Sequence, residues 1–185
     1  YVGKIASSAA TVIERTRDFL WTLDPAKARL HDLIVYLEDA GRALFADGET
    51  ALTVEHPPES CRHRRLDPPR KREIAFLFKE ALHNAWKHAN AKIVCLRFRC
   101  DGNVLEVELI DDGRGFDESS DAPGHGLSNM RARARAAGGD LAIASLPGQG
   151  TTVRFRGLGL SPERGMVPTS APTYARSIDG KGANS

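Results

Sequence analysis

The sequence predicts an α+β fold in which a layer of helices packs on a mixed, mostly antiparallel sheet, forming a two-layer sandwich. The first observation is that strand-like segments occur in pairs joined by tight turns, such as 92–100 and 103–111 around Asp101-Gly102. The second is that helical segments separate these pairs, whereas a parallel sheet would alternate single strands with helices. We therefore expect helices on one face of the sheet, in a domain over residues 46–160 that follows a helical N-terminal segment.

The N-terminal segment is predicted to contain two helices. In residues 3–23, apolar and small residues recur at alternating spacings of four and three, which is typical of a helix that packs along one seam. The partner of that seam is left open, since a second copy of the chain and the chain's own domain fit it equally well. Asp24-Pro25 ends this helix, and a second helix is expected over residues 28–46.

The remaining elements follow from hydrophobic periodicity and from turn residues. Helices are expected over 70–89 and 127–137, and the second of them ends at Gly138-Gly139. Residues 161–185 show no apolar periodicity and are predicted to be a flexible tail. The other segments are a strand at 51–55, a Pro- and Arg-rich loop at 56–70, a loop at 112–125, and strands at 140–145 and 150–156.

The composition excludes several classes of protein. The 26 basic and 24 acidic residues give a net charge of +2, without the basic excess of a dedicated nucleic-acid binder, so no nucleic-acid partner is expected. No apolar run is long enough to span a membrane, and we expect a cytoplasmic protein whose membrane anchor, if it has one, lies upstream of Tyr1. The three cysteines lack zinc-ligand spacing and are expected to be reduced thiols, with Cys95 and Cys100 on opposite faces of one strand.

Two adjacent aspartates follow one another at the end of the strand at 103–111, and strand alternation assigns them to opposite faces. Asp111 continues the inward-facing series that runs from Leu105 to Leu109, whereas Asp112 belongs to the polar, outward-facing series. A carboxylate directed toward a core is costly unless it has a partner. Asp111 is therefore expected either to cap a nearby backbone turn or to bind a ligand.

The last strand brings a second polar group to the same side of the sheet. Thr151, Val153 and Phe155 share its inward face, with Thr151 at the strand end. A carboxylate acceptor and a hydroxyl at the edge of an apolar pocket suit a flat heteroaromatic ring with an exocyclic amine. Adenine fits this description.

The helix at 70–89 carries a polar stripe beside its apolar one. Glu80, Asn84, Lys87 and His88 fall within an arc of about 100°, given 3.6 residues per turn. Carboxylate and amide oxygens are ligands that Mg²⁺ takes when it also binds phosphates, and a lysine supplies a point charge for phosphate oxygens. For the helix alone, the alternative interpretation is a solvated face with a polar i,i+4 pair.

Two glycine pairs flank the loop at 112–125. Gly113 and Gly115 follow the aspartates, and Gly124 and Gly126 precede the next helix. Neither pair matches the phosphate-binding P-loop or the dinucleotide-binding fingerprint. Gly126 nevertheless lies at a helix start, where free N–H groups and the helix dipole favour an anion.

Four of these segments, in this order, resemble the ATP-binding catalytic domain of sensor histidine kinases in the GHKL ATPase superfamily. They read KEALHNAWKHAN (79–90), LIDDGRGFDE (109–118), GHGLSNMRARARAAGG (124–139) and GQGTTVRF (148–155). The likeness is greatest to kinases of the nitrate-sensor/degradation-sensor type. Upstream, RDFLWTLDPAKARLHDLIVYLED (17–39) resembles the stretch that joins the family's dimerisation helices to the catalytic domain, which makes residues 1–45 the end of a dimerisation helix and a linker helix.

The resemblance implies a role for each matching residue. Asn84 would bind Mg²⁺, and Glu80 would be the catalytic acid that assists the attacking group or a metal-bound water. Asp111 would accept a hydrogen of the adenine amino group, with Thr151 supporting the adenine side. The other residues implied to contact ATP are Lys87 and His88 near the phosphates, Gly113, Gly115 and Phe116 near the base, and Gly124, His125, Gly126 and Leu127 over the phosphates, beside a short ATP lid at 117–123.

The resemblance also implies a reaction and its partners. In this family the γ-phosphoryl group of ATP is transferred to a histidine, and from there to an aspartate of a response regulator. The implied partners are ATP and ADP with Mg²⁺, the dimerisation domain of the same protein, a response regulator, and a second copy of the chain in a homodimer.

One histidine matches the family's acceptor motif only superficially. Leu30-His31-Asp32 contains the expected LHD, yet Asn84 follows His31 by 53 positions (84 − 31), too few for the second dimerisation helix and linker. The acceptor is therefore expected upstream of Tyr1, so that this chain alone binds ATP without phosphorylating itself. The alternatives are an anti-sigma-factor serine kinase or nucleotide-dependent switch, which lacks an upstream dimerisation hairpin, and a gyrase- or chaperone-like ATPase, which has a following transducer domain.

Overall fold

A computed structural model describes Trp21, Asp24 and residues 27–117 and 125–161. The predicted helix at 3–23 apart from Trp21, most of the predicted lid, and nearly all of the predicted tail lie outside the described residues. The predictions made for those segments therefore stay predictions.

A five-stranded sheet forms one layer of the molecule, in the order β1-β3-β4-β6-β5. The outer strand β1 runs parallel to β3, and the other neighbours are antiparallel. A second, two-stranded sheet pairs β2 with β7. The strands are β1 (Ala51–Glu55), β2 (Arg65–Leu66), β3 (Ile93–Asp101), β4 (Val104–Asp111), β5 (Gly139–Ser145), β6 (Thr151–Leu158) and β7 (Leu160–Ser161).

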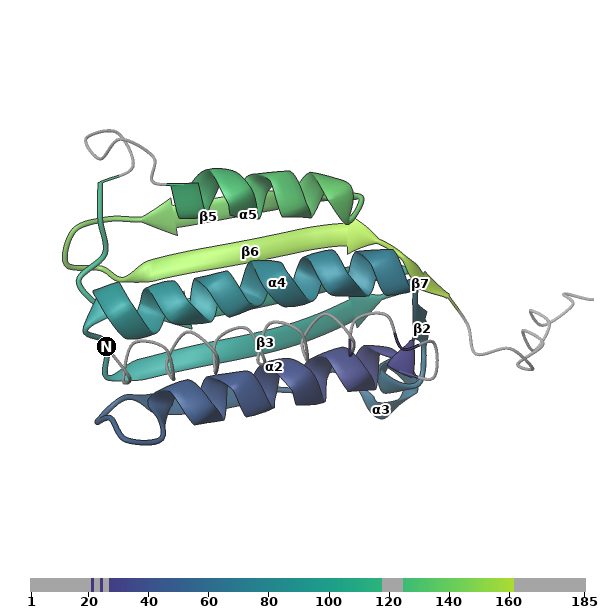
Figure 1. The fold of residues 1–185 in the computed structure, drawn as a ribbon, viewed down its shortest axis with the longest axis horizontal. Coiled ribbons are helices and arrows are strands. Elements are labelled where there is room, and N and C mark those ends of the chain that lie inside the picture. Colours follow the sequence, from purple (N-terminus) through teal and green to yellow (C-terminus); the bar gives the residue numbers. More distant parts are fainter. Residues whose placement is uncertain (1–20, 22–23, 25–26, 118–124, 162–185) are drawn as a thin grey trace, which may run out of the picture.

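Three helices cover one face of the large sheet, side by side in the order α2, α4, α5 (Figure 1). They are α2 (Leu30–Phe45), α4 (Pro68–Asn84) and α5 (His125–Ala136). The short helix α3 (Glu59–Arg62) precedes β2, and a π-helical turn, η2 (Ala85–Ala89), continues α4. The predicted fold class, a mixed and mostly antiparallel sheet with helices on one face, is confirmed.

The core lies between the helices and the sheet, as the sequence periodicities predict. On β3, alternate residues Val94, Leu96 and Phe98 face the helices and are buried. On α4, Leu77 and Phe78 belong to the apolar stripe and are fully buried. The buried face of α2 joins the same core, so this helix packs on the sandwich whichever domain it is assigned to.

Several boundaries differ from the predicted ones for local reasons. The helix predicted at 70–89 begins at Pro68, since proline at the first helical turn needs no N–H partner. The predicted loop at 56–70 contains α3 and β2, because Leu66 is buried and pairs with Leu160 of β7. Ser161, the first residue of the predicted tail, therefore belongs to β7 and pairs with Arg65 of β2.

The expectation that all three cysteines are reduced is wrong for two of them. Cys61 of α3 and Cys100 of β3 form a disulfide across 39 positions, with their Cα atoms 6.4 Å apart. Spacing along the chain does not reveal this bond, because α3 folds back onto the end of β3 and brings the two residues together. Cys95 remains a free thiol.

A buried lysine attaches the N-terminal segment to the helix layer. Lys71 of α4 is fully buried, and its ammonium group donates hydrogen bonds to the backbone carbonyls of Trp21 (3.3 Å) and Lys27. The same ammonium lies 4.1 Å from the centre of the Trp21 ring, which stacks on Tyr36 of α2 at 4.0 Å. Burial lowers the pKa of Lys71, while the nearby carboxylates of Asp32 and Asp24 oppose this effect.

In the described part of the chain, no helix combines the length and the apolar character needed to cross a lipid bilayer.

Candidate nucleotide-binding site

A cavity of about 630 Å³ lies at one end of the sandwich, between the C-terminal turns of α4, the start of α5 and the ends of β4 and β6. Its floor is apolar and includes Leu109, Met130, Ile143 and Val153. Polar groups enter from two sides, from the sheet and from the α4–η2 helix. Of the predicted site residues, those that line it are Glu80, Asn84, Lys87, His88, Asp111, Gly115, Phe116, Gly126, Leu127 and Thr151.

Asp111 ends β4 on the cavity side and is 7% exposed, as strand alternation predicts. Its Oδ1 accepts a hydrogen bond from the backbone N–H of Gly113 at 3.0 Å, so it does cap its own turn, one of the two expected roles. Burial raises the pKa of Asp111, although backbone N–H groups of Gly113 and Thr151 counteract it. Asp111 also lies directly opposite Thr151 in the β4–β6 register, which brings the carboxylate and the hydroxyl to one wall of the cavity.

Asp112 is exposed, as predicted, but its carboxylate has a specific partner. Its Oδ1 accepts hydrogen bonds from the backbone N–H groups of Lys92 and Ile93, both at 2.8 Å. The N–H of Ile93 in particular, followed by that of Lys92, holds the pKa of Asp112 below its usual range. The second aspartate therefore joins the start of β3 to the end of β4.

The glycines after the aspartates are required by close backbone packing. A side-chain carbon at Gly113 would lie 2.3 Å from the carbonyl oxygen of Ala89, and one at Gly115 would lie 2.1 Å from that of Leu146. Gly115 also has a φ of 60°, which favours glycine. In this structure the loop after Asp112 is thus held between the end of η2 and the β5–β6 turn.

The polar stripe predicted on the helix at 70–89 lies on two kinds of helix. Glu80 and Asn84 are on consecutive turns of α4, whereas Lys87 and His88 are in the π-helical turn η2. π-Helical turns are rare in proteins, and those that do occur are often found at functional sites. Lys87 and His88 still line the cavity, although the sequence predicts an unbroken α-helix through residue 89.

Gly126 brings the first turn of α5 against this stripe. A side-chain carbon at residue 126 would lie 2.9 Å from Glu80 Oε1 and 3.8 Å from Asn84 Nδ2. A carboxylate oxygen and an amide side chain therefore lie beside the N-terminus of a helix. This donor set fits a hard cation bound together with an anion. Among the described residues, no cluster of three His, Cys, Asp or Glu side chains is arranged to hold a metal on its own.

Three predicted residues are not among those that line the cavity. Gly113 is buried beneath it and donates to Asp111, Gly124 lies outside the described residues, and only the backbone of His125 is described, as the first residue of α5. The sequence interpretation missed His83 and Arg114, which also line the cavity. His83 lies in the motif at 79–90 and Arg114 in the motif at 109–118.

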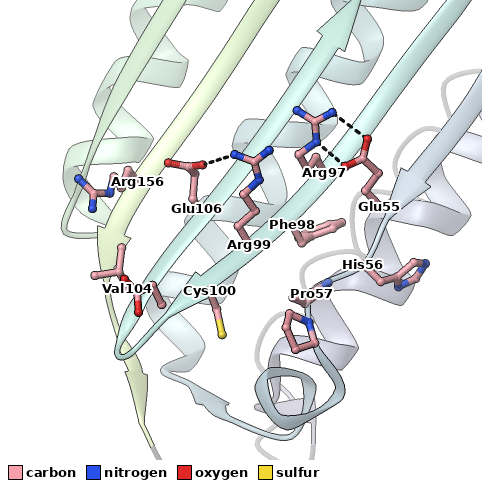
Figure 2. Close-up of a pocket in the computed structure, with 12 residues that line it drawn as sticks. Glu55, His56, Pro57, Arg97, Phe98, Arg99, Cys100, Val104, Glu106 and Arg156 are labelled. Atoms are coloured by element: carbon pink, nitrogen blue, oxygen red, sulfur yellow. Dashed lines mark hydrogen bonds and ion pairs between the residues drawn. The ribbon is translucent and has the colours of Figure 1, made fainter.

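A second cavity, of about 440 Å³, lies on the opposite face of the sheet (Figure 2). Its charged side chains largely pair across neighbouring strands: Glu55 with Arg97 at 2.5 Å, and Arg99 with Glu106 at 3.7 Å. Next to it, the buried Glu108 pairs with Arg97 at 3.3 Å and with Arg154 at 2.5 Å. This face is a ladder of charges of alternating sign across neighbouring strands.

Comparison with known proteins identifies the family of the domain that contains the larger cavity. Residues 70–160 match the family model described as "Histidine kinase-, DNA gyrase B-, and HSP90-like ATPase". These residues form an ATPase domain of this family. The match includes every described residue that lines the larger cavity, from Glu80 to Val153.

Two proteins similar to this chain are described as histidine kinases. An uncharacterized sensor-like histidine kinase of Chloroflexus aurantiacus is 32% identical over 160 residues, which are 82% of this chain and 26% of the relative. The histidine kinase domain of the Erythrobacter litoralis blue-light activated histidine kinase superposes with a TM-score of 0.58 at 25% identity, over 69% of this chain and 61% of that domain. The chain thus spans about a quarter of the curated relative's length. As a member of an ATPase family, the domain is an ATP-binding one.

Proposed function

We propose that this ATPase domain binds Mg²⁺·ATP in the larger cavity and transfers the γ-phosphoryl group to a histidine of a dimerisation domain, for relay to a response-regulator aspartate. The observation that carries the proposal is the shared cavity. A buried carboxylate on an apolar floor, at the sheet, faces a carboxylate–amide pair and a lysine on the α4–η2 helix. This arrangement suits a molecule with an amino-bearing ring at one end and metal-bound phosphates at the other.

In this proposal the adenine amino group donates to Asp111, and the ring lies against the apolar floor. Phe116 and Gly115 contribute the edge of the base site, next to Thr151. The remaining hydrogen-bonding capacity of the Asp111 carboxylate, beyond its bond from Gly113, provides the acceptor.

At the other end, Asn84 and Glu80 hold the Mg²⁺ ion, which supplies charge neutralisation for the phosphates. Glu80 also assists the attacking group in this proposal. Lys87 and His88 supply donors to phosphate oxygens, and the N–H groups at the start of α5, from His125 to Leu127, with Gly124 before them, supply the rest. Catalysis of this kind depends chiefly on positioning and charge.

The phosphoacceptor is proposed to lie upstream of this chain. His31 is exposed at the start of α2, where Leu30 N–H bonds to the carbonyl of Arg64. The start of α2 lies beside the start of α4 at Pro68. Glu80 is about 18 Å further along α4, at 1.5 Å per residue. In Figure 1 the starts of α2 and α4 lie at the same end of the helix layer, opposite the end where α4 finishes. This separation supports the interpretation that His31 is not the acceptor.

A thermal-unfolding titration tests the nucleotide assignment. Mg²⁺·ADP at a hundred times its Kd should stabilise the folded chain by about 2.7 kcal/mol if it binds only the native state. Asp111→Ala should abolish most of this shift, whereas Asp140→Ala, an exposed aspartate on the opposite face of β5, should retain it. An absent shift in the wild type, or an equal shift in Asp111→Ala, would refute the assignment.

Radiolabelled ATP tests the phosphoryl transfer. A protein that joins this chain to the proposed upstream dimerisation domain should acquire an acid-labile label from γ-labelled ATP, and Asn84→Ala should prevent it. The chain of residues 1–185 by itself should stay unlabelled. A stable label on this chain that disappears in His31→Gln would overturn the proposed position of the acceptor.

A further inference from the structure

The hydroxyl group of Ser145, at the end of β5, joins three segments of the cavity wall. It receives a hydrogen bond from the backbone N–H of Phe116 at 2.9 Å and lies 3.0 Å from the carbonyl oxygen of Gly150. It also lies 3.0 Å from the hydroxyl oxygen of Thr151. Ser145 is half-buried, and its backbone pairs with Thr151 in the β5–β6 register.

Counting protons assigns a direction to each of these bonds. A serine hydroxyl has one proton to donate and two lone pairs to accept with. The carbonyl of Gly150 can only accept, so the proton of Ser145 points to it. The N–H of Phe116 occupies one lone pair. The contact with Thr151 is then satisfied only if Thr151 donates its own proton to the second lone pair of Ser145.

The direction of the Thr151 proton determines what Thr151 offers to the cavity. With its proton held by Ser145, the oxygen of Thr151 has only lone pairs left for a ligand. Asp111, directly opposite on β4, is likewise an acceptor. Two acceptors therefore face the same part of the cavity.

We propose that Ser145 is a positioning residue that fixes the Thr151 hydroxyl as an acceptor and so restricts the site to purine nucleotides with a 6-amino group. This inference rests on the proposed binding of ATP in this cavity. A 6-amino group donates two hydrogens, which matches two acceptors. A 6-oxo group, as in hypoxanthine or guanine, has only lone pairs. Its oxygen would face the acceptor oxygens of Asp111 and Thr151 without a hydrogen between them.

The experiment compares ADP with inosine 5′-diphosphate (IDP), which carries an oxygen in place of the 6-amino group. Calorimetric titrations of the wild-type chain with each Mg²⁺ complex should give a Kd for IDP at least about a hundredfold above that for ADP. In Ser145→Ala the Thr151 hydroxyl is free to rotate and to donate to the 6-oxygen. The ratio of the two Kd values should then fall at least about tenfold, mainly through tighter binding of IDP.

A double-mutant cycle distinguishes positioning from a general structural effect. Thr151→Val removes the hydroxyl that Ser145 is proposed to orient, so it should lower the ratio by itself, and adding Ser145→Ala should then leave the ratio unchanged. Ser145→Thr, which keeps a hydroxyl, should retain the wild-type ratio. If Ser145→Ala weakens ADP and IDP by the same factor, or lowers the ratio equally with and without Thr151, the proposal is wrong.

Two further outcomes complete the test. If Ser145→Ala does not fold, Thr151→Val decides, because an unchanged ratio in that variant overturns the proposal. If the wild-type chain binds neither ADP nor IDP, the proposed nucleotide site is itself refuted. Wild-type binding of ADP with an equal affinity for IDP would refute the role of Ser145 and the amino-group contact of Asp111, while leaving nucleotide binding in the cavity intact.

Discussion

Gly126 and Glu80 meet at the boundary between α5 and α4, where a methyl group on residue 126 would lie 2.9 Å from Glu80 Oε1. This oxygen is at the end of a flexible side chain, so Gly126→Ala should displace the carboxylate and leave the backbone in place. We expect the free energy of unfolding to stay the same or rise by about 0.5 kcal/mol, since alanine favours a helix more than glycine does. Phosphoryl transfer by this chain joined to the proposed upstream acceptor domain should fall at least about tenfold.

Chemical denaturation and phosphorylation assays on the same preparations check this expectation. Gly48→Ala is the matched control, because the nearest atoms to a side-chain carbon there are 3.9 Å away and Gly48 lies outside the cavity. If Gly126→Ala matches Gly48→Ala in both assays, the position of Glu80 has no influence on the reaction.

The Asp111 carboxylate should lower the free energy of unfolding when no nucleotide is bound, and it should strengthen the binding of nucleotide. Burial raises its pKa, so the native state holds this proton more tightly than the unfolded state. The stability that the proton contributes is complete below the unfolded pKa of about 3.9 and is lost as the pH rises through the higher folded value. Asp111→Asn should therefore unfold at an equal or higher temperature than wild type at neutral pH, and this difference should shrink on acidification.

The same variant should bind Mg²⁺·ADP at least about tenfold more weakly, because the amide N–H₂ would face the donor amino group. Unfolding temperatures from pH 4 to pH 8, with and without ADP, measure both effects. A variant that is less stable than wild type at neutral pH would show that the backbone N–H groups of Gly113 and Thr151 stabilise the negative charge of Asp111 more than burial destabilises it.

Asp112, by contrast, should contribute to stability and not to binding. Asp112→Ala removes the acceptor for the N–H groups of Lys92 and Ile93, and these two amides should exchange faster with solvent in an NMR experiment. The unfolding temperature should fall while the Kd for ADP stays unchanged. Because the folded pKa is lowered, this stability is present above the unfolded pKa of about 3.9 and is lost as the pH falls through the folded value. Unchanged exchange at both amides would contradict the assignment.

The disulfide between Cys61 and Cys100 should stabilise the domain by about 2–4 kcal/mol, because it closes a 39-position loop in the unfolded chain. Urea denaturation in the presence and absence of a reductant measures this difference. The double variant Cys61→Ser/Cys100→Ser should match the reduced wild type and be insensitive to reductant. Cys95→Ser should behave as wild type in both conditions, and equal midpoints for oxidised and reduced wild type would show that the bond contributes nothing.

Lys71 should hold the N-terminal segment on the helix layer. Lys71→Met keeps most of the aliphatic stem but leaves the carbonyls of Trp21 and Lys27 without this donor, at a cost of about 1–3 kcal/mol. In a Trp86→Phe background, which leaves Trp21 as the one tryptophan, its fluorescence should shift toward longer wavelength. Lys92→Met, at an exposed lysine, is the control, and an unshifted spectrum in Lys71→Met would show that Trp21 is held by other contacts.

Local periodicity was sufficient to find the residues whose neighbours lie in the same element. Alternation along β4 and β6 predicted that Asp111 and Thr151 face the helices, and helical spacing predicted that Glu80 and Asn84 share a face. The partners of Asp112 could not be predicted in this way, because Lys92 and Ile93 are backbone donors at the start of β3, 20 and 19 positions away in the chain. Nor did the sequence distinguish Ser145 from any other residue at a strand end, since its role depends on three segments that meet only in the folded chain.

The charge ladder on the open face of the sheet has a consequence for the cavity on the other face. Glu108 and Arg154 are opposite each other three residues before Asp111 and three residues after Thr151, on the same pair of strands. Sliding β6 by one position would send Arg154 to the helix face and separate the two charges. The ion pair between Glu108 and Arg154 therefore fixes the register of β4 and β6. While it is formed, Thr151 is the residue opposite Asp111.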